Sequence, residues 1–250
     1  MQGKSSPARV GPELSEARPL RRVGHKGADL IEPGNTPASF DAALAHGVDM
    51  IELDVLPERG GDRLVLAHDY EDAARRQPIE LARGLAHLAS RHFESIEFIV
   101  DLKLPGYELF VLEALSEAGL KERSIVSSQF RESLTRIRAA DAAVRLGWSV
   151  PRARRDYFRS PFLAAPAYVA LRLMRITLPR RARVALRARL CDAIIAHWRL
   201  VTPNLVAAVK NLKGELYAWT VDDAARIRAL AALGVTGVIT NDPRLFTESA

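Results

Sequence analysis

The chain has 250 residues, 48% of them hydrophobic, which is enough for one domain with a large core. Its formal net charge of +6 comes from one segment, residues 152–190, so a general nucleic-acid-binding character is excluded. The single cysteine, Cys191, excludes an internal disulfide, and beside a predicted strand it indicates a small buried apolar residue. Residues 1–20 have no apolar core and no run of about 18 apolar residues occurs anywhere, so we expect a flexible N-terminal segment and a cytoplasmic protein.

Short β-rich runs alternate with amphipathic stretches along residues 21–250. We expect eight strands, at residues 22–25, 50–55, 97–103, 124–128, 144–148, 192–197, 216–220 and 237–240. Helical patterns lie between them, for example over residues 36–45 and 223–233, and a glycine follows each of these two. Eight strands with helical crossovers predict an α/β fold of the single (β/α)8 TIM-barrel class, with a doubly wound open sheet as the alternative.

An extra strand is predicted at residues 64–68, after the polar, glycine-rich turn at residues 59–62. We expect it to form a hairpin with the end of the second strand. It would bring His68 to the mouth of the barrel.

The second strand contains two acids, Glu52 and Asp54, which are two residues apart and therefore project to the same face. Two adjacent carboxylates inside a barrel repel each other unless a cation lies between them. A hard divalent ion, Mg²⁺ or Ca²⁺, suits oxygen ligands. The alternative is that both acids cap helices or pair with arginines, and the spacing alone favours neither.

The third strand ends in Asp101 and Lys103, again on one face. Because barrel active sites lie at the carboxyl ends of the strands, Asp101 could complete the metal site while Lys103 faces a metal-bound phosphate. Taken alone, the pair is more typical of a salt bridge between strands.

Two histidines are predicted at the same mouth, His25 at the end of the first strand and His68 at the end of the hairpin. Cleavage of a phosphodiester needs one group that accepts a proton and another that protonates the leaving alkoxide, and histidine titrates in the useful range. The other four histidines are interpreted as structural.

These residues form a pattern that resembles the glycerophosphodiester phosphodiesterase family in order and spacing across residues 21–246. The first half carries Gly24-His25-Lys26-Gly27, Pro33-Gly34-Asn35-Thr36, Gly47-Val48-Asp49-Met50-Ile51-Glu52-Leu53-Asp54-Val55 and Ala67-His68-Asp69. The second half carries Asp101-Leu102-Lys103, Ala218-Trp219-Thr220-Val221 and Gly237-Val238-Ile239-Thr240-Asn241-Asp242-Pro243. The resemblance implies a barrel that releases an alcohol from glycerol 3-phosphate diesters with a bound metal ion.

The resemblance also implies roles for individual residues. His25 and His68 match the acid/base pair, and Glu52, Asp54 and Asp101 match the metal ligands. Substrate and phosphate contacts fall to Lys26, Lys103 and the aromatic Trp219. The chain resembles a short form of the family, because only 32 residues separate His68 from Asp101 and most of the usual helical insertion is absent.

Three positions depart from the family pattern. Asp101 stands where Glu is usual, and Lys26 replaces an arginine, exchanging a bidentate fork for a point charge. Gly34 stands where the family has Glu, and Glu32, two residues earlier, could partly substitute. These departures affect the expected substrate and metal preference more than the reaction class.

Residues 152–190 contain eleven arginines and one acid, and interleaved apolar residues make the segment amphipathic. We interpret it as an insertion in the barrel that contacts an anionic membrane peripherally or covers the mouth, with a solvated crossover helix as the alternative. No interleaved aromatic residues indicate nucleic-acid stacking.

Three functions remain in competition. The leading one is metal-dependent hydrolysis of small glycerophosphodiesters to glycerol 3-phosphate and an alcohol. The second is a lysophospholipase D that acts on membrane-derived lysophospholipids. The third is a barrel-type binding module without catalysis, against which the retained histidines and acids argue.

Overall fold

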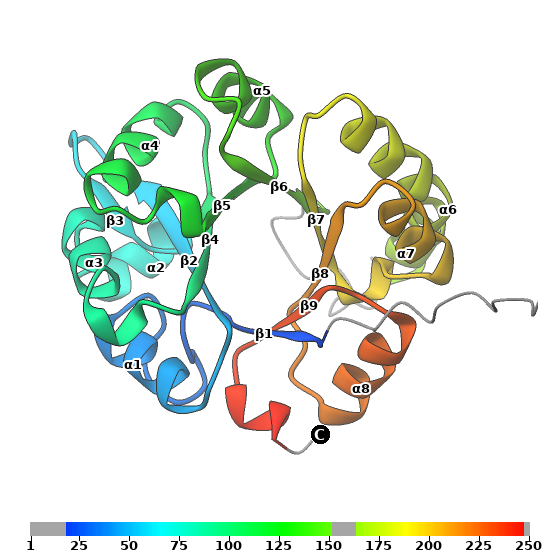
Figure 1. Cartoon of the computed structure of the whole chain (residues 1–250), viewed down its shortest axis with the longest axis horizontal. Helices are drawn as coiled ribbons and strands as arrows, with labels where there is room; N and C mark the ends of the chain where they lie inside the picture. The colour runs from blue at the N-terminus through cyan, green and yellow to red at the C-terminus, as the bar shows by residue number, and fades with distance from the viewer. Residues whose placement is uncertain (1–18, 152–163, 248–250) are drawn as a thin grey trace, which may run out of the picture.

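The computed structural model describes residues 19–151 and 164–247, which form a closed barrel of parallel strands inside a ring of helices (Figure 1). Strand β1 pairs in parallel with both β2 and β9, and this pairing closes the sheet. The barrel strands are β1 (Arg21–Gly24), β2 (Met50–Pro57), β4 (Glu97–Leu102), β5 (Ser124–Ser128), β6 (Arg145–Val150), β7 (Ala193–His197), β8 (Glu215–Trp219) and β9 (Gly237–Thr240). The predicted TIM barrel is confirmed and the open sheet is not formed.

The helices pack their apolar faces on the outward-facing residues of the strands. They are α1 (Pro37–Ala45), α2 (Tyr70–Arg75), α3 (Leu81–Leu88), α4 (Glu108–Glu117), α5 (Arg131–Ala140), α6 (Ala164–Arg187), α7 (Pro203–Lys210) and α8 (Ala224–Leu233), with 3₁₀ turns η1 (Arg91–Phe93), η2 (Lys121–Arg123), η4 (Trp198–Leu200) and η5 (Pro243–Phe246). Capping residues next to the helices fix where they begin and end. Helix α8, for example, begins where the Asp223 carboxylate accepts a hydrogen bond from the Arg226 amide, and ends at Gly234 with φ of 89°.

The extra strand β3 (Leu64–Leu66) pairs antiparallel with the end of β2, with Val55 opposite Leu66. The predicted hairpin is therefore confirmed, and His68 follows it directly. Cys191 is buried, as expected from its apolar surroundings.

The barrel interior is filled in layers contributed by alternate strands, as is usual for this fold. The lowest layer is ionic, because Glu97 lies between Arg21 at 2.5 Å and Arg145 at 2.6 Å, and Arg145 also contacts Glu215 at 3.0 Å. An apolar cluster fills the middle of the barrel: Val23, Met50, Ile99, Ile125, Ala193, Ile195, Tyr217 and Ile239. Polar residues follow at the carboxyl ends of the strands, so the apolar cluster separates the ionic layer from a polar mouth.

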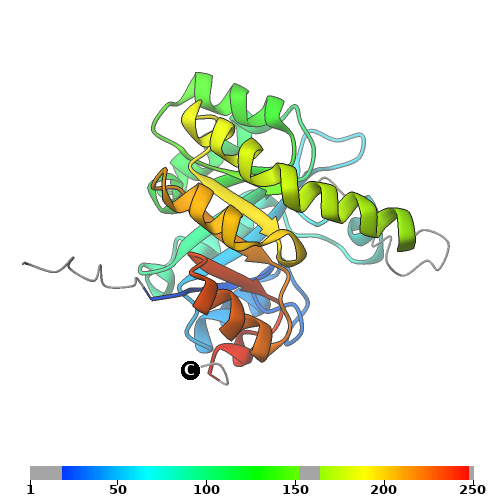
Figure 2. The same ribbon diagram turned by 90° about the vertical axis from the view of Figure 1, so that its right-hand side faces the viewer.

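Helix α6 is longer than its neighbours, with 24 residues. In Figure 2 its N-terminal half, in yellow-green, projects past the barrel on the side toward which the strands point. Residues 1–18 and 152–163 lie outside the described residues, and with them most of the expected flexible segment and the first part of the basic insertion. In the part of the chain that the structure describes, no helix has the length and hydropathy of a membrane span.

Candidate active site

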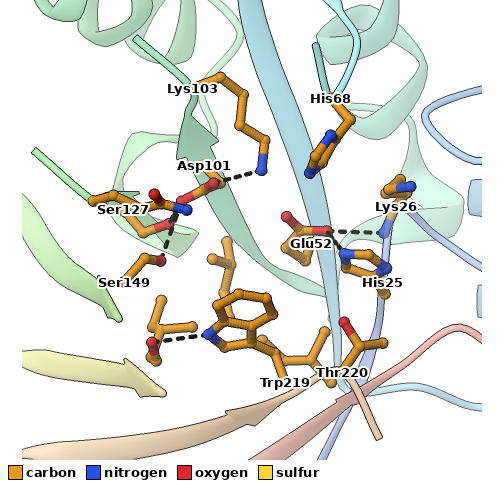
Figure 3. Close-up of a pocket in the computed structure, with 14 residues that line it drawn as sticks. His25, Lys26, Glu52, His68, Asp101, Lys103, Ser127, Ser149, Trp219 and Thr220 are labelled. Carbon is orange, nitrogen blue, oxygen red and sulfur yellow. Dashed lines mark hydrogen bonds and ion pairs between the residues drawn. The ribbon is translucent and has the colours of Figure 1, made fainter. Parts of the chain in front are cut away.

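A cavity of about 230 Å³ opens at the carboxyl ends of the barrel strands (Figure 3). Seven of the eight residues selected from the sequence line it: His25, Lys26, Glu52, His68, Asp101, Lys103 and Trp219. The eighth, Asp54, is fully buried beneath them. In Figure 3, Asp101 and Lys103 lie on one side of Glu52, and the two histidines with Lys26 lie on the other.

Three carboxylates converge because β2 and β4 are adjacent and Asp54 is in register with Asp101. Each of Glu52, Asp54 and Asp101 offers an oxygen within 4.8 Å of the others, and all three side chains are buried. The alternation of β2 directs Ile51, Leu53 and Val55 outward to the helices, which leaves the two acids inside.

The three acids respond to this crowding in different ways. Burial, followed by repulsion from Asp54, raises the pKa of Glu52 well above its ordinary value. Burial would also raise the pKa of Asp54, but the positive charges around it, that of Lys103 foremost, together outweigh burial and lower that pKa. Burial likewise opposes charge on Lys103, yet Asp101 at 2.7 Å and Asp54, its second ion-pair partner, raise the pKa of Lys103.

The donor set fits a hard divalent cation. It consists of three buried carboxylates with no sulfur or imidazole among them. Lys103 pairs with two of these carboxylates, and its single positive charge does not neutralise all three. Burial and the repulsion from Asp54 make the ionised form of Glu52 unfavourable, and a bound cation would remove that penalty. These three residues would hold the ion.

Asn35 positions one of these acids, a role that the sequence analysis missed. Its side chain accepts a hydrogen bond from the Asp54 amide at 3.0 Å and donates one to the Asp54 carboxylate at 3.1 Å. It is buried and has φ of 59°, in the left-handed region that asparagine tolerates. Its place in the Pro33-Gly34-Asn35-Thr36 motif was the available signal.

His25 is held by a chain of hydrogen bonds at the end of β1. Its Nδ1 lies 2.6 Å from Oδ1 of Asn241, whose amide group donates to Asp222 at 2.7 Å. Because Asp222 accepts only, Asn241 presents its oxygen to His25, so Nδ1 carries the proton. Nε2 is then the basic nitrogen, and it lies 3.8 Å from Glu52. Burial is the main cause that lowers the pKa of His25.

His68 lies on the same side of Glu52 as His25 and is half exposed (Figure 3). Its Nδ1 lies 2.9 Å from the carboxylate of Asp69, which also caps α2 by accepting from the amides of Glu71 and Asp72. The same helix cap therefore orients the imidazole, and Nε2 is again the nitrogen left for proton transfer.

Lys26 is not free to act as a simple substitute for arginine. Its ammonium pairs with Asp29 at 2.9 Å, while its backbone amide donates to Glu52 at 2.9 Å.

The suggested role of Glu32 is not borne out, because Glu32 is exposed and outside the cavity wall. Asp29 instead takes the space beside Gly34, where an added Cβ would lie 2.3 Å from the Asp29 carboxylate.

Two serines and a tryptophan complete the mouth. Ser127 donates to Asp101 at 2.5 Å and Ser149 lies 3.3 Å from the same oxygen, a pair that the sequence analysis missed. The available signal in the sequence was a serine near the carboxyl end of each of two predicted strands. The indole of Trp219 donates to the carbonyl of Ile195 at 3.0 Å, which fixes its ring in the wall.

Comparisons with known proteins identify the family. The model of the glycerophosphoryl diester phosphodiesterase family matches residues 108–245, more than half of the chain. A glycerophosphodiester phosphodiesterase of Caldanaerobacter subterraneus is 26% identical and covers 88% of this chain and 93% of its own.

Two solved structures have the same fold. A glycerophosphodiester phosphodiesterase from Parabacteroides distasonis aligns with a TM-score of 0.71 and 15% identity, over 92% of this chain and 98% of that one. A phosphodiesterase of Oleispira antarctica in complex with the product sn-glycerol-3-phosphate aligns with a TM-score of 0.66 and 17% identity, over 92% and 96%.

The family match and the barrel fold together define the class of protein, a phosphoric diester hydrolase with a TIM-barrel fold. The chain belongs to the glycerophosphoryl diester phosphodiesterase family and is a hydrolase of glycerophosphodiesters. The matched range begins after the motifs between residues 24 and 103, so the two halves support the assignment independently.

Proposed function

We propose that the chain hydrolyses glycerophosphodiesters to glycerol 3-phosphate and an alcohol, with a divalent cation held by Glu52, Asp54 and Asp101. The observation that carries this proposal is the convergence of three buried carboxylates within 4.8 Å in a cavity flanked by two histidines. When bound, the cation would polarise a phosphoryl oxygen and neutralise its charge. Lys103, and Lys26 on the opposite side, add positive charge to the same cavity.

The histidines supply the proton transfers. One Nε2 accepts the proton of the attacking hydroxyl, which belongs to water or to the substrate's own glycerol 2-hydroxyl, as a new P–O bond forms. The other gives a proton to the alkoxide whose P–O bond breaks. Asn241 and Asp69 hold the two rings in the required tautomers.

The metal role is tested by titrating Mg²⁺, Ca²⁺ and Mn²⁺ into the chelated protein by calorimetry, alongside turnover of glycerophosphocholine. We expect Glu52→Gln to lose both metal binding and turnover while its melting temperature stays unchanged or rises, because a crowded like charge is removed. Glu58→Gln, in the exposed turn after the same strand, is the matched control. Full activity of the chelated wild type would refute the metal role.

A second candidate, hydrolysis of lysophospholipids drawn from an anionic bilayer, is favoured by the surface of α6. Val169, Leu173 and Ile176 are spaced to lie on one face of the helix and are 58%, 58% and 75% exposed. The opposite face packs on the barrel through the partly buried Met174 and the buried Leu178. The apolar stripe therefore faces away from the core, on the part of α6 that projects beside the mouth.

Arginines flank this stripe. Arg172, Arg175, Arg180 and Arg183 are all exposed and, in the described residues, none of them forms an ion pair. Each arginine that reaches an anionic lipid surface contributes roughly 1 kcal/mol, and apolar side chains can then insert shallowly. An anionic bilayer is the partner that satisfies both features.

Vesicle sedimentation tests this contact. We expect binding to vesicles containing anionic lipid but not to purely zwitterionic ones, and weaker binding as salt shortens the Debye length from about 10 Å at 0.1 M to about 3 Å at 1 M. Changing the four arginines to Gln, or the three stripe residues to Ser, should weaken it while sparing glycerophosphocholine turnover. Changing the exposed Leu109 and Phe110 of α4 to Ser is the control. Equal sedimentation with neutral and anionic lipid would show that α6 is a solvated crossover helix without a preference for anionic lipid.

A further inference from the structure

A second cavity, of about 390 Å³, opens beside the active site. Gln129 and Ser149 belong to the walls of both cavities, and Ser149 Oγ lies 3.3 Å from the carboxylate of Asp101. The second cavity therefore begins one side chain away from the acidic cluster. A substrate bound at that cluster could extend into it without leaving the protein surface.

Two arginines define the chemistry of this cavity. The guanidinium carbons of Arg131 and Arg181 lie 5.4 Å and 5.3 Å from the centre of the Trp148 ring, which is itself buried. Stacking on one indole holds both planar groups in place and leaves their N–H donors available. Among the residues described, no carboxylate forms an ion pair with either arginine.

The rest of the wall is consistent with an anionic ligand. Arg131 is the first residue of α5, and the phenyl ring of its N-cap residue, Phe130, has no acceptor for the first amides of the helix, so the partial positive charge of this helix end adds to that of the guanidinium. Glu132 also lines the cavity, in the first turn of the same helix, and it is exposed like Arg131 and Arg181. The two guanidinium groups outnumber this one carboxylate.

We propose that the second cavity binds a phosphate group carried by the leaving alcohol of the diester. This inference rests on the proposed function. The glycerol side of any glycerophosphodiester is uncharged, so only the alcohol can bring an anion to a cavity next to the scissile phosphate. Two guanidinium groups match the bidentate geometry of phosphate oxygens. The preferred substrates are therefore diesters whose alcohol is itself phosphorylated.

Two substrates, one without and one with a phosphate on the leaving alcohol, test the inference. Glycerophosphoglycerol has an uncharged leaving alcohol, glycerol. In bis(glycerophospho)glycerol the leaving glycerol carries a second, anionic phosphodiester that ends in another glycerol. We expect the wild type to have a lower KM for the second compound. Arg131→Gln and Arg181→Gln should each raise that KM about tenfold and leave glycerophosphoglycerol kinetics within about twofold. Arg181→Lys should recover only part of the effect, because lysine lacks the planar fork.

Arg183→Gln, on the same helix but outside the cavity wall, is the matched control and should change neither substrate. Equal effects of Arg131→Gln and Arg181→Gln on both substrates, or no effect on either, would overturn the subsite. If the wild type cleaves neither compound with any divalent ion, the proposed function fails instead. Calorimetric titration of both compounds in EDTA then tests the subsite without turnover. The subsite requires that the wild type bind bis(glycerophospho)glycerol more tightly than glycerophosphoglycerol, and that Arg181→Gln abolish this difference.

Discussion

At the scale of single residues, the site depends on polar side chains that orient its carboxylates and histidines. Asn35 binds both the amide and the carboxylate of Asp54, and Asn241 fixes the tautomer of His25. Such supporting contacts decide whether a carboxylate or imidazole points at the substrate. The reactive residues could be selected from the sequence by their chemistry, whereas their supports are ordinary polar residues until the fold brings them together.

The histidines carry the sharpest prediction at this scale. His25→Ala and His68→Ala should each lower turnover of glycerophosphocholine by at least about 10²-fold, the usual effect of losing a general acid or base. His92→Ala, an exposed histidine outside the cavity, should leave turnover unchanged. A near-normal rate in either cavity variant would remove that histidine from the mechanism.

At the scale of elements, the strands share the barrel interior by matching large side chains with small ones. Gly147 of β6 faces the interior, where an added Cβ would lie 2.7 Å from Ile195 Cδ1 and 3.0 Å from Ser127 Cβ. Both neighbours also line the active-site cavity. A glycine in the middle of a strand is here a packing requirement of the adjacent strands.

Gly147→Ala should therefore lower the free energy of unfolding by about 1–3 kcal/mol, the usual cost of overpacking a filled core. Denaturant titration measures this as a lower midpoint with an unchanged slope. Gly61→Ala is the control, because its added Cβ would meet only the side chain of Glu58, which pairs with Arg63 outside the core. Equal midpoints for the two variants would show that the interior has room at β6.

At the scale of the whole molecule, the ionic layer at the barrel floor links alternate strands. Burial opposes the shift, but hydrogen bonds from Arg21 and Arg145 outweigh it and lower the pKa of Glu97 from 4.5 to about 2. The folded state thus binds fewer protons than the unfolded state between these values. This contribution to stability is present above about pH 4.5 and is lost as the pH falls toward 2.

Glu97→Gln should consequently be less stable than the wild type at pH 7, by about 1–3 kcal/mol, because Arg21 loses its carboxylate partner and Arg145 keeps only Glu215. Its unfolding free energy should also fall less between pH 5 and pH 3 than that of the wild type. Denaturation curves at the two pH values measure the difference. Parallel losses in both proteins would mean that Glu97 does not couple folding to protons.

The order of elements could be predicted from the sequence, because strand and helix periodicities are local properties. The eight strands lie within a few residues of their expected places, and the acids at positions 52 and 54 share a face because strand alternation permits nothing else. The family pattern in residues 24–103 added the likeness to known phosphodiesterases, which the comparisons confirm.

Only the tertiary structure decided which distant residues meet. Closure of β1 on β9 brings Asn241 to His25, and the register of β2 with β4 sets Asp101 beside Asp54. The stacking of Arg131 and Arg181 on Trp148 joins α5, α6 and β6. Residue type and spacing follow from the chain itself, whereas contacts between elements depend on barrel closure and strand register, which no local pattern encodes.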